Sequence, residues 1–418
     1  MSRNATDMEN RTTARQHLLD SIDAHEALEF LAAMVRFKSY SGTSGENELA
    51  RFMVEHMREL GLEARLQPVE AQRHNAIGTL KGAGGGRSLL FNGHMDTNPA
   101  TEGWTVDPWG GLYDDQFIYG IGVSNMKSGD AAALMALKTL VSAGVRLKGD
   151  VILEYVVGEL QGGIGTVTAI EAGVRADCFI NMEPTDLNGL TLHAGSFNVE
   201  IELTGTTRHI SKREEAVDAI AAACALVPRF NALTFSGAAT LEHASVNRAN
   251  IGVIRGALSP EFHDWRPPQV ADFVRLAGTA RYAPSQSEQS VLLDIRALLG
   301  DLEREFPGLR TKVVKQHAGE RPSMLPFEVA PDTPIVEAVS RAYETVRGEP
   351  QRLGPVRPYC FYGTDAAHLL HRAGMPGLVC GPGGRYNTMP DERVDVSDYL
   401  DAIRIYLLAV LDVCEPLP

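Results

Sequence analysis

The stretch RSLLFNGHMD, residues 87–96, decides the fold. An apolar run of the kind that forms a buried strand leads directly into a polar cluster with a histidine and an aspartate. Residues 125–144 (NMKSGDAAALMALKTLVSAG) then predict a helix, and residues 150–159 (DVILEYVVGE) predict a second strand that ends in a carboxylate. Strands that alternate with helices are typical of an α/β sheet, in which reactive groups gather at the carboxyl ends of the strands.

The same α/β pattern continues on both sides of this stretch. Residues 14–36 and 44–60 predict helices, the second because apolar side chains recur at helical spacing until Gly61. Near the C-terminus, residues 333–346 and 398–414 predict two further helices, on either side of the apolar run MPGLVCGPGG. Both ends of the chain therefore belong to one α/β domain.

The middle of the chain has a different character. Residues 197–205 (FNVEIELTG) alternate as a half-buried strand, a helical stretch begins at about Lys212, and residues 290–297 (SVLLDIRA) predict another strand. This pattern predicts a smaller α+β domain inserted into a discontinuous α/β catalytic domain. The expected boundaries are 1–195 and 317–418 for the catalytic domain and 196–316 for the inserted domain.

Composition narrows the class of partner. The chain has 418 residues, 44% hydrophobic and 22% charged, as expected for a globular protein of about two domains. Its formal net charge of −14 repels phosphate backbones and anionic lipid, which predicts a small-molecule partner and neither nucleic acid nor a membrane. The polar N-terminus has no apolar stretch for a signal peptide, which predicts a cytoplasmic protein.

Seven short motifs follow one another in an order that chance does not explain. They are GHMDTNP (93–99), YGIGVSNMKSGDAA (119–132), VVGELQGGIGT (156–166), NMEPT (181–185), GTTRHIS (205–211), YGTDA (362–366) and CGPGG (380–384). In this order the chain resembles the metallopeptidase family that contains aminoacylases, acetylornithine and succinyl-diaminopimelate deacylases, and glutamate carboxypeptidases. The resemblance implies a di-zinc aminopeptidase-like catalytic domain with a ferredoxin-like lid, through which the chain forms a dimer or a larger homo-oligomer.

The resemblance assigns roles to four residues that match the family pattern. His94 and Glu183 match the terminal ligands of one metal ion, and Asp96 matches the carboxylate that orients the histidine. Glu159 matches the general base, which takes a proton from the attacking water. One half of the family's metal centre is therefore intact.

The other half departs from the family. The carboxylate that bridges two zinc ions falls on Asn125, the second glutamate of the pair falls on Leu160, and the late histidine falls on Thr388 or Asn387. Leucine offers no ligand atom, and a neutral amide oxygen is a weaker ligand than a carboxylate. We therefore expect one labile divalent ion, Mn, Zn or Co. Its expected ligands are His94, Asn125 and Glu183.

Further residues are predicted to act on the substrate. His209 matches the family's lid histidine, which reaches into the partner's site; the alternative is a surface histidine on a turn. Arg281 stands where the family has an amide and could clamp a carboxylate of an anionic substrate, or could be a surface charge. Tyr386 and Asn387 flank the cleft and are expected to contact the substrate.

Two enzymatic functions and one binding function fit these observations. The first is an aminohydrolase that uses a metal-activated water to release ammonia from an aromatic amine, converting 5-nitroanthranilate to 5-nitrosalicylate; this activity rests on resemblance. A single metal suffices there, because the nitro group stabilises the negative charge of the addition step. The alternative is an N-acyl-amino-acid amidohydrolase, for which a lost metal is costly. A non-catalytic binding homologue is the third reading.

Overall fold

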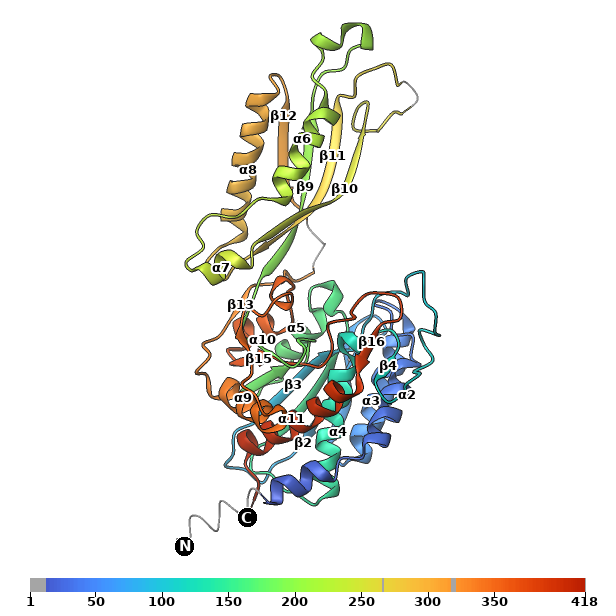
Figure 1. Cartoon of the computed structure of the whole chain (residues 1–418), viewed down its shortest axis with the longest axis vertical. Helices are drawn as coiled ribbons and strands as arrows, with labels where there is room; N and C mark the ends of the chain where they lie inside the picture. Colours follow the sequence, from blue (N-terminus) through green and yellow to red (C-terminus); the bar gives the residue numbers. More distant parts are fainter. Residues whose placement is uncertain (1–12, 265–266, 317–320, 418) are drawn as a thin grey trace. The chain divides into compact units, whose positions relative to one another are not determined.

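The computed structural model describes residues 13–264, 267–316 and 321–417 (Figure 1). The chain divides into two compact units, which we call the large unit (Met1–Leu192, Glu328–Tyr359 and Thr364–Pro418) and the small unit (His193–Phe327 and Cys360–Gly363). The small unit extends beyond the expected boundary at residue 316, because the Ser196 amide donates to the Met324 carbonyl at 2.8 Å. It also includes residues 360–363, since the Ala194 amide donates to the Cys360 carbonyl at 2.9 Å.

The large unit is built on an eight-stranded sheet. Its central strands β5, β3, β6 and β15 run parallel to one another. The pairs β1–β2, β2–β5 and β15–β7 are antiparallel. In spatial order the strands are β1 (Glu63–Glu70), β2 (Arg73–Leu80), β5 (Val151–Val156), β3 (Leu89–His94), β6 (Cys178–Asn181), β15 (Gly377–Val379), β7 (Gly189–Leu190) and β14 (Leu353–Gly354). A separate pair joins β4 (Phe117–Tyr119) to β16 (Arg393–Asp395).

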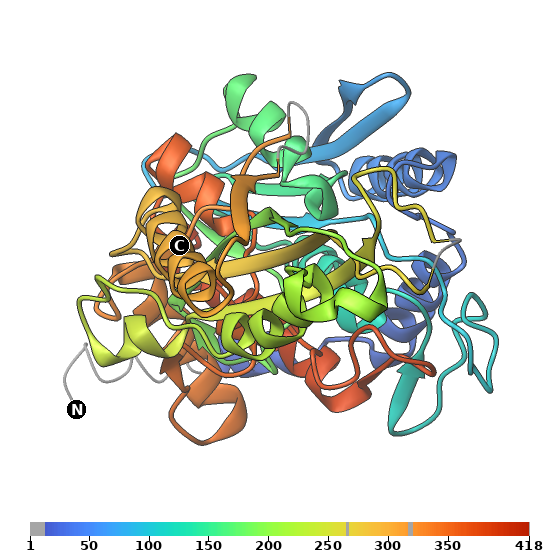
Figure 2. The ribbon, with the colours of Figure 1, turned by 90° about the horizontal axis from the view of Figure 1, so that it is seen from above.

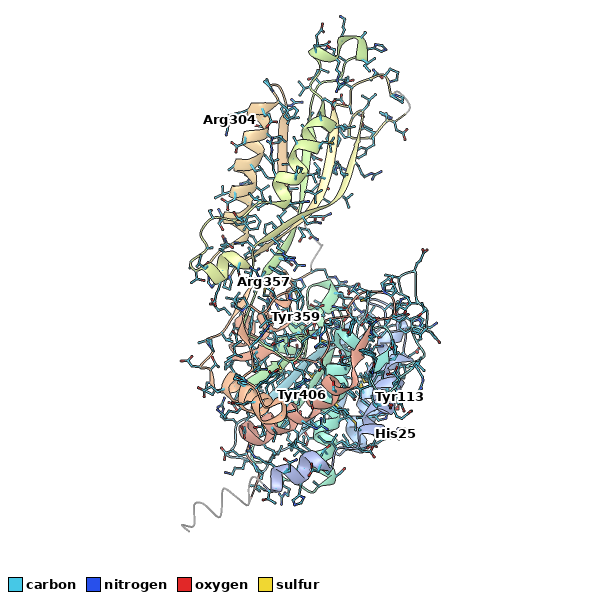
Figure 3. All side chains as sticks on the ribbon, in the orientation of Figure 1. His25, Tyr113, Arg304, Arg357, Tyr359 and Tyr406 are labelled. Carbon is cyan, nitrogen blue, oxygen red and sulfur yellow. The ribbon has the colours of Figure 1, made fainter. Side chains whose placement is uncertain are left out.

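Helices cover both faces of this sheet. Leu89 and Phe91 of β3 join the larger hydrophobic core, whereas Leu90 between them does not, as expected when successive side chains point to opposite faces. Tyr406, labelled in Figure 3, is fully buried in this core and donates its hydroxyl hydrogen to the Cys380 carbonyl at 2.7 Å. On the core side lie α2 (Ala24–Val35), α3 (Ser44–Glu59), α4 (Ser128–Ser142), α9 (Pro334–Arg347) and α11 (Val396–Cys414); α5 (Ile164–Glu171) and α10 (Ala366–Ala373) pack on each other outside it.

The expected single helix at 14–36 is wrong. Residues 13–20 are helical, the chain then turns, and α2 begins after Asp23. The Asp23 side chain accepts a hydrogen bond from the Glu26 amide at 3.0 Å, which caps the new helix. This cap marks the start of α2, which the apolar pattern of residues 14–36 did not reveal.

The small unit carries helices on one face of a four-stranded antiparallel sheet. Helices α6 and α8 share one hydrophobic core with the sheet (Figures 1 and 2), and β9 alternates between buried and partly exposed side chains as predicted. The strands, in spatial order, are β10 (Arg248–Ala257), β11 (Phe273–Tyr282), β9 (Gly195–Thr204) and β12 (Arg310–Lys315). The helices are α6 (Ala219–Asn231), α7 (Leu241–Ser245), α8 (Glu288–Glu305) and the short 3₁₀ segment η3 (Ile210–Glu215).

The strand predicted at 290–297 is wrong, because these residues lie within α8. The buried side chains of α8 recur at helical spacing over about three turns, at Val291, Ile295, Leu299 and Leu302. Ser287 and Ser290 form a reciprocal cap at its start. The window read as a strand was too short to show the helical period.

No helix in the described ranges is long and apolar enough to cross a membrane. The polar N-terminal segment on which the cytoplasmic expectation rests lies largely outside the described residues.

Candidate active site

The predicted reactive residues of the large unit meet at the carboxyl ends of its parallel strands. His94 is the last residue of β3, Glu159 follows the end of β5 by three residues, and Glu183 follows the end of β6 by two. Because β3 runs parallel to both β5 and β6, these three ends lie at the same edge of the sheet. Ligand atoms of all three side chains lie within 4.8 Å of one another, and all three residues are buried.

The geometry of this group fits a divalent metal ion. The Nε2 atom of His94 lies 3.1 Å from Asn125 Oδ1 and 3.3 Å from Glu183 Oε1. Donors of a tetrahedral site with bonds of about 2.0–2.1 Å are about 3.3 Å apart. The other ring nitrogen, Nδ1, is 2.8 Å from the Asp96 carbonyl oxygen, so a proton there leaves Nε2 free as a ligand. The distances from His94 to Asn125 and Glu183 are compatible with the predicted ligands His94, Asn125 and Glu183, whose role remains a prediction.

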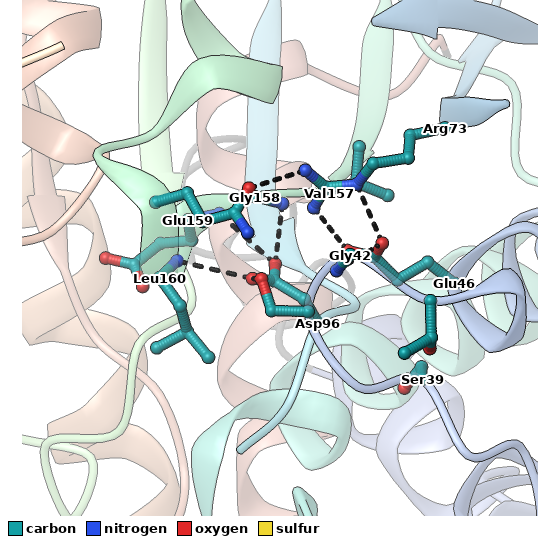
Figure 4. A network of polar contacts seen from close by, with 12 residues as sticks. Ser39, Gly42, Glu46, Arg73, Asp96, Val157, Gly158, Glu159 and Leu160 are labelled. Carbon is teal, nitrogen blue, oxygen red and sulfur yellow. Dashed lines mark hydrogen bonds and ion pairs between the residues drawn. The ribbon is translucent and has the colours of Figure 1, made fainter. Parts of the chain in front are cut away.

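Asp96 supports this site in a different way from the one expected. Its carboxylate lies 3.7 Å from His94 Nδ1, too far for a hydrogen bond, and the backbone carbonyl orients the ring instead. The carboxylate accepts the amides of Gly158 (2.9 Å), Glu159 (3.2 Å) and Leu160 (3.3 Å) (Figure 4). Asp96 therefore fixes the turn that carries the candidate general base.

A buried ion pair anchors the same turn from its other side. The Arg73 guanidinium binds Glu46 through two hydrogen bonds of 2.6 and 2.8 Å, and it donates to Gln161 Oε1 at 2.6 Å (Figure 4). Glu46 also accepts the Gly42 amide at 2.9 Å, next to Ser41, whose hydroxyl donates to Asp96. We call this closed set of contacts the Arg73–Glu46 ring. No sequence pattern indicates this contact, because the two charged residues are 27 positions apart.

Burial and mutual charge perturb the titration of the site. Burial lowers the pKa of His94, but the charge of Glu183 and the hydrogen bond to it raise the pKa well above its ordinary value. Burial and the neighbouring Glu183 carboxylate raise the pKa of Glu159 well above its ordinary value. A cation bound beside these two buried carboxyl groups and the histidine would offset the negative charge of the carboxylates.

A pocket opens beside this group. It encloses about 410 Å³ of free space, including solvent at its mouth, and its walls include His94, Asp96 and Asn125. Asn387 and Thr388, the two candidates for the missing late histidine, both line it, and the Thr388 hydroxyl donates to Asn387 Oδ1 at 2.7 Å. Further lining residues are Leu160, Trp104, Ile121, Met389 and Glu392. Trp104, Ile121, Met389 and Glu392 were not identified from the sequence, since isolated residues in loops form no pattern.

Three of the predicted substrate contacts do not line this pocket. Tyr386 instead packs against the Arg393 guanidinium, 3.9 Å from its ring centroid, and lies edge-on to Phe117. His209 is an exposed residue of the small unit whose Nδ1 lies 3.0 Å from the Ser211 hydroxyl. Arg281 belongs to β11 of the same unit. Roles for His209 and Arg281 in the site remain predictions.

The fold and the site together define an α/β metal-dependent hydrolase with a smaller inserted unit. The chain belongs to the Peptidase family M20/M25/M40, whose sequence model matches residues 90–412. The expected family, fold class and hydrolase activity on carbon–nitrogen bonds are therefore confirmed, and the family depends on divalent metal ions.

Relatives of known activity match nearly the whole chain. An N-formyl-4-amino-5-aminomethyl-2-methylpyrimidine deformylase of Bacillus subtilis (strain 168) is 25% identical over 420 residues, covering 93% of this chain and 95% of its own. An acetylornithine deacetylase of Klebsiella pneumoniae (strain 342) is 27% identical over 389 residues, covering 88% and 92%. The crystal structure of aminopeptidase PepT from Bacillus cereus ATCC 10987 matches with a TM-score of 0.74 at 20% identity, covering 94% and 100%. This last likeness shows the fold alone.

Proposed function

We propose that the protein is a single-metal hydrolase that removes an acyl or formyl group from an amine. The observation that carries the proposal is the buried group of His94, Glu159 and Glu183, with Asn125 beside it and Leu160 in place of a further ligand. The deformylase and deacetylase relatives support deacylation as the reaction, and they favour it over the nitroaromatic aminohydrolase.

Each residue of the site has a defined task in such a reaction. A divalent ion bound there would polarise the amide carbonyl and lower the pKa of a bound water. Glu159 takes the proton of the attacking water and returns it to the departing amine nitrogen, and its burial raises its affinity for that proton. Asp96 holds the turn of Glu159 through three backbone amides. The Glu159 carboxylate is therefore already in place when the substrate binds.

The aminohydrolase is retained as a second candidate because of one observation. Leu160 lines the pocket in place of the family's second metal ligand, and Asn125 is neutral. A site with one metal ion offers less positive charge to a tetrahedral oxyanion than a site with two. A substrate that spreads this charge itself, such as an aromatic amine with a para nitro group, makes a smaller demand on the protein. 5-Nitroanthranilate, hydrolysed with release of ammonia, is the test compound for this reading.

One assay separates the two reactions and the non-catalytic reading. Protein loaded with Mn, Zn or Co is incubated with N-formyl and N-acetyl amines, N-acetyl amino acids and aminobenzoates including 5-nitroanthranilate. Release of formate or acetate with a primary amine supports the deacylase, and release of ammonia from 5-nitroanthranilate alone replaces it by the aminohydrolase. No turnover with any metal, by protein that binds the metal, would leave only the binding homologue.

The small unit is proposed to complete the site in a homo-oligomer. The family resemblance supports His209 as a residue of the partner's site and Arg281 as a clamp for a substrate carboxylate. In a mixed dimer, one chain carrying Glu159→Gln and the other His209→Ala, we expect part of the activity to return. For an anionic substrate, Arg281→Met is expected to raise KM more than Arg281→Lys does; unchanged kinetics in both would exclude the clamp.

A further inference from the structure

One wall of the pocket is apolar and faces open space. Leu160 is 40% exposed and Met389 is 40% exposed, although both are large hydrophobic residues that line the pocket. Ile121, which is buried, and Trp104, which is half-buried, complete this wall. Exposed apolar surface that gathers in a concave site is typical of a place where a ligand is bound.

None of the described residues that line the pocket is Lys or Arg. Charge is provided there only by His94, Asp96 and Glu392, of which Asp96 already accepts three backbone amides. Glu392 accepts the Ser124 amide at 3.0 Å. The apolar wall therefore offers no partner to a charged group, and it suits a neutral one.

We propose that Leu160, Ile121, Met389 and Trp104 form a subsite for an uncharged apolar part of the substrate. The inference rests on the proposed function, because the metal group at the other end of the pocket then holds the bond that is cleaved. Leu160 stands where the family has a second metal ligand. In this subsite its side chain would contact the substrate and favour an apolar one.

The test compares the affinities of two neutral ligands, and it does not require turnover. Calorimetry on the metal-loaded protein should show phenylacetamide binding at least about ten-fold more tightly than acetamide. Leu160→Gln should reduce this preference by about ten-fold, and Leu160→Ala by a similar factor. Leu112→Gln is the matched control, because Leu112 is 54% exposed in the same unit but does not line the pocket.

The results that refute the subsite differ from the results that refute the proposed function. Equal affinity of the wild type for phenylacetamide and acetamide, or an unchanged preference in Leu160→Gln, overturns the subsite even if N-formyl amines are hydrolysed. If phenylacetamide is preferred and the preference depends on Leu160 while no N-acyl or N-formyl amine is turned over, the subsite stands and deacylation is refuted. For active protein, the ratio of kcat/KM for N-formylbenzylamine to that for N-formylmethylamine should fall in parallel with the binding preference.

Discussion

The Arg73–Glu46 ring can be tested by removing one or both of its charges. The single variants are Glu46→Gln and Arg73→Met, and the double variant is Glu46→Leu with Arg73→Met. The Glu46 side chain is fully buried and that of Arg73 is 10% exposed, so each single variant leaves a charged or polar group buried without its partner. The double variant removes both charges and fills a similar volume with apolar groups.

The size of the effect follows from the contacts. Two charge-assisted hydrogen bonds of 2.6 and 2.8 Å join the pair, and breaking a buried pair by removing one partner costs about 3–5 kcal/mol. Glu70, with a side chain 36% exposed, lies 3.1 Å from Arg73 and offers it a second carboxylate, which favours the lower value for Glu46→Gln. Burial and the charge of Asp96 raise the pKa of Glu46 despite the hydrogen bond from Arg73, whereas Glu46 raises the pKa of Arg73 despite its burial. The double variant leaves no buried charge without a partner, so it should lose less stability than either single variant.

Activity distinguishes a positioning role from a merely structural one. The ring holds Gln161 and the loop of Asp96, and through them Glu159, without lining the pocket. We expect kcat of the double variant to fall about ten-fold or more, with KM changed less than about two-fold, because the base is displaced while the walls remain. Urea unfolding and steady-state kinetics measure the two effects, with the exposed pair Lys81–Asp150 as control: Lys81→Met should cost less than about 1 kcal/mol. A loss below about 1 kcal/mol in Glu46→Gln, or full kcat in the double variant, would refute this account.

Three further results are expected. Glu159→Gln should lower kcat by at least about 100-fold and leave metal binding intact, as measured by kinetics and calorimetry; more than a few per cent of residual activity would exclude it as the base. Elemental analysis after gentle dialysis should find about one divalent ion per chain, and two tightly bound ions would contradict a site in which Leu160 and Thr388 replace ligands. Burial lowers the pKa of His368 to about 4, so the folded state binds fewer protons than the unfolded state between pH 4 and about 6.5, and stability falls as the pH decreases through that window. His368→Gln should flatten this dependence in urea titrations by up to about 1.4 kcal/mol per pH unit; an unchanged slope would show that His368 does not titrate there.

The site was predictable where chemistry coincides with the end of a strand. His94, Glu159 and Glu183 each follow an apolar run, and parallel strands bring such ends together whatever lies between them in sequence. The contact between Arg73 and Glu46 could not be read in this way, because it joins a strand to a helix through side chains and leaves no periodic trace. The strand predicted at residues 290–297 was wrong for a different reason. A short apolar run fits both a strand and a helix, and only the full length of α8 shows the helical period.

The retained half of the metal centre argues against a site that has decayed into a binding surface. Glu159 and Glu183 are 8% and 3% exposed, close to each other and to His94, and burial with like charge raises the pKa of Glu159. Carboxyl groups in such a place destabilise a fold unless a cation or a proton compensates them, so substitution would relieve the protein if nothing were bound. A cation alone would account for His94 and Glu183. It would not account for Asp96, whose carboxylate is committed to three amides of the turn that presents Glu159. The structure thus holds the Glu159 carboxylate beside the candidate metal ligands, where the proposed hydrolysis needs a proton acceptor and metal binding alone does not.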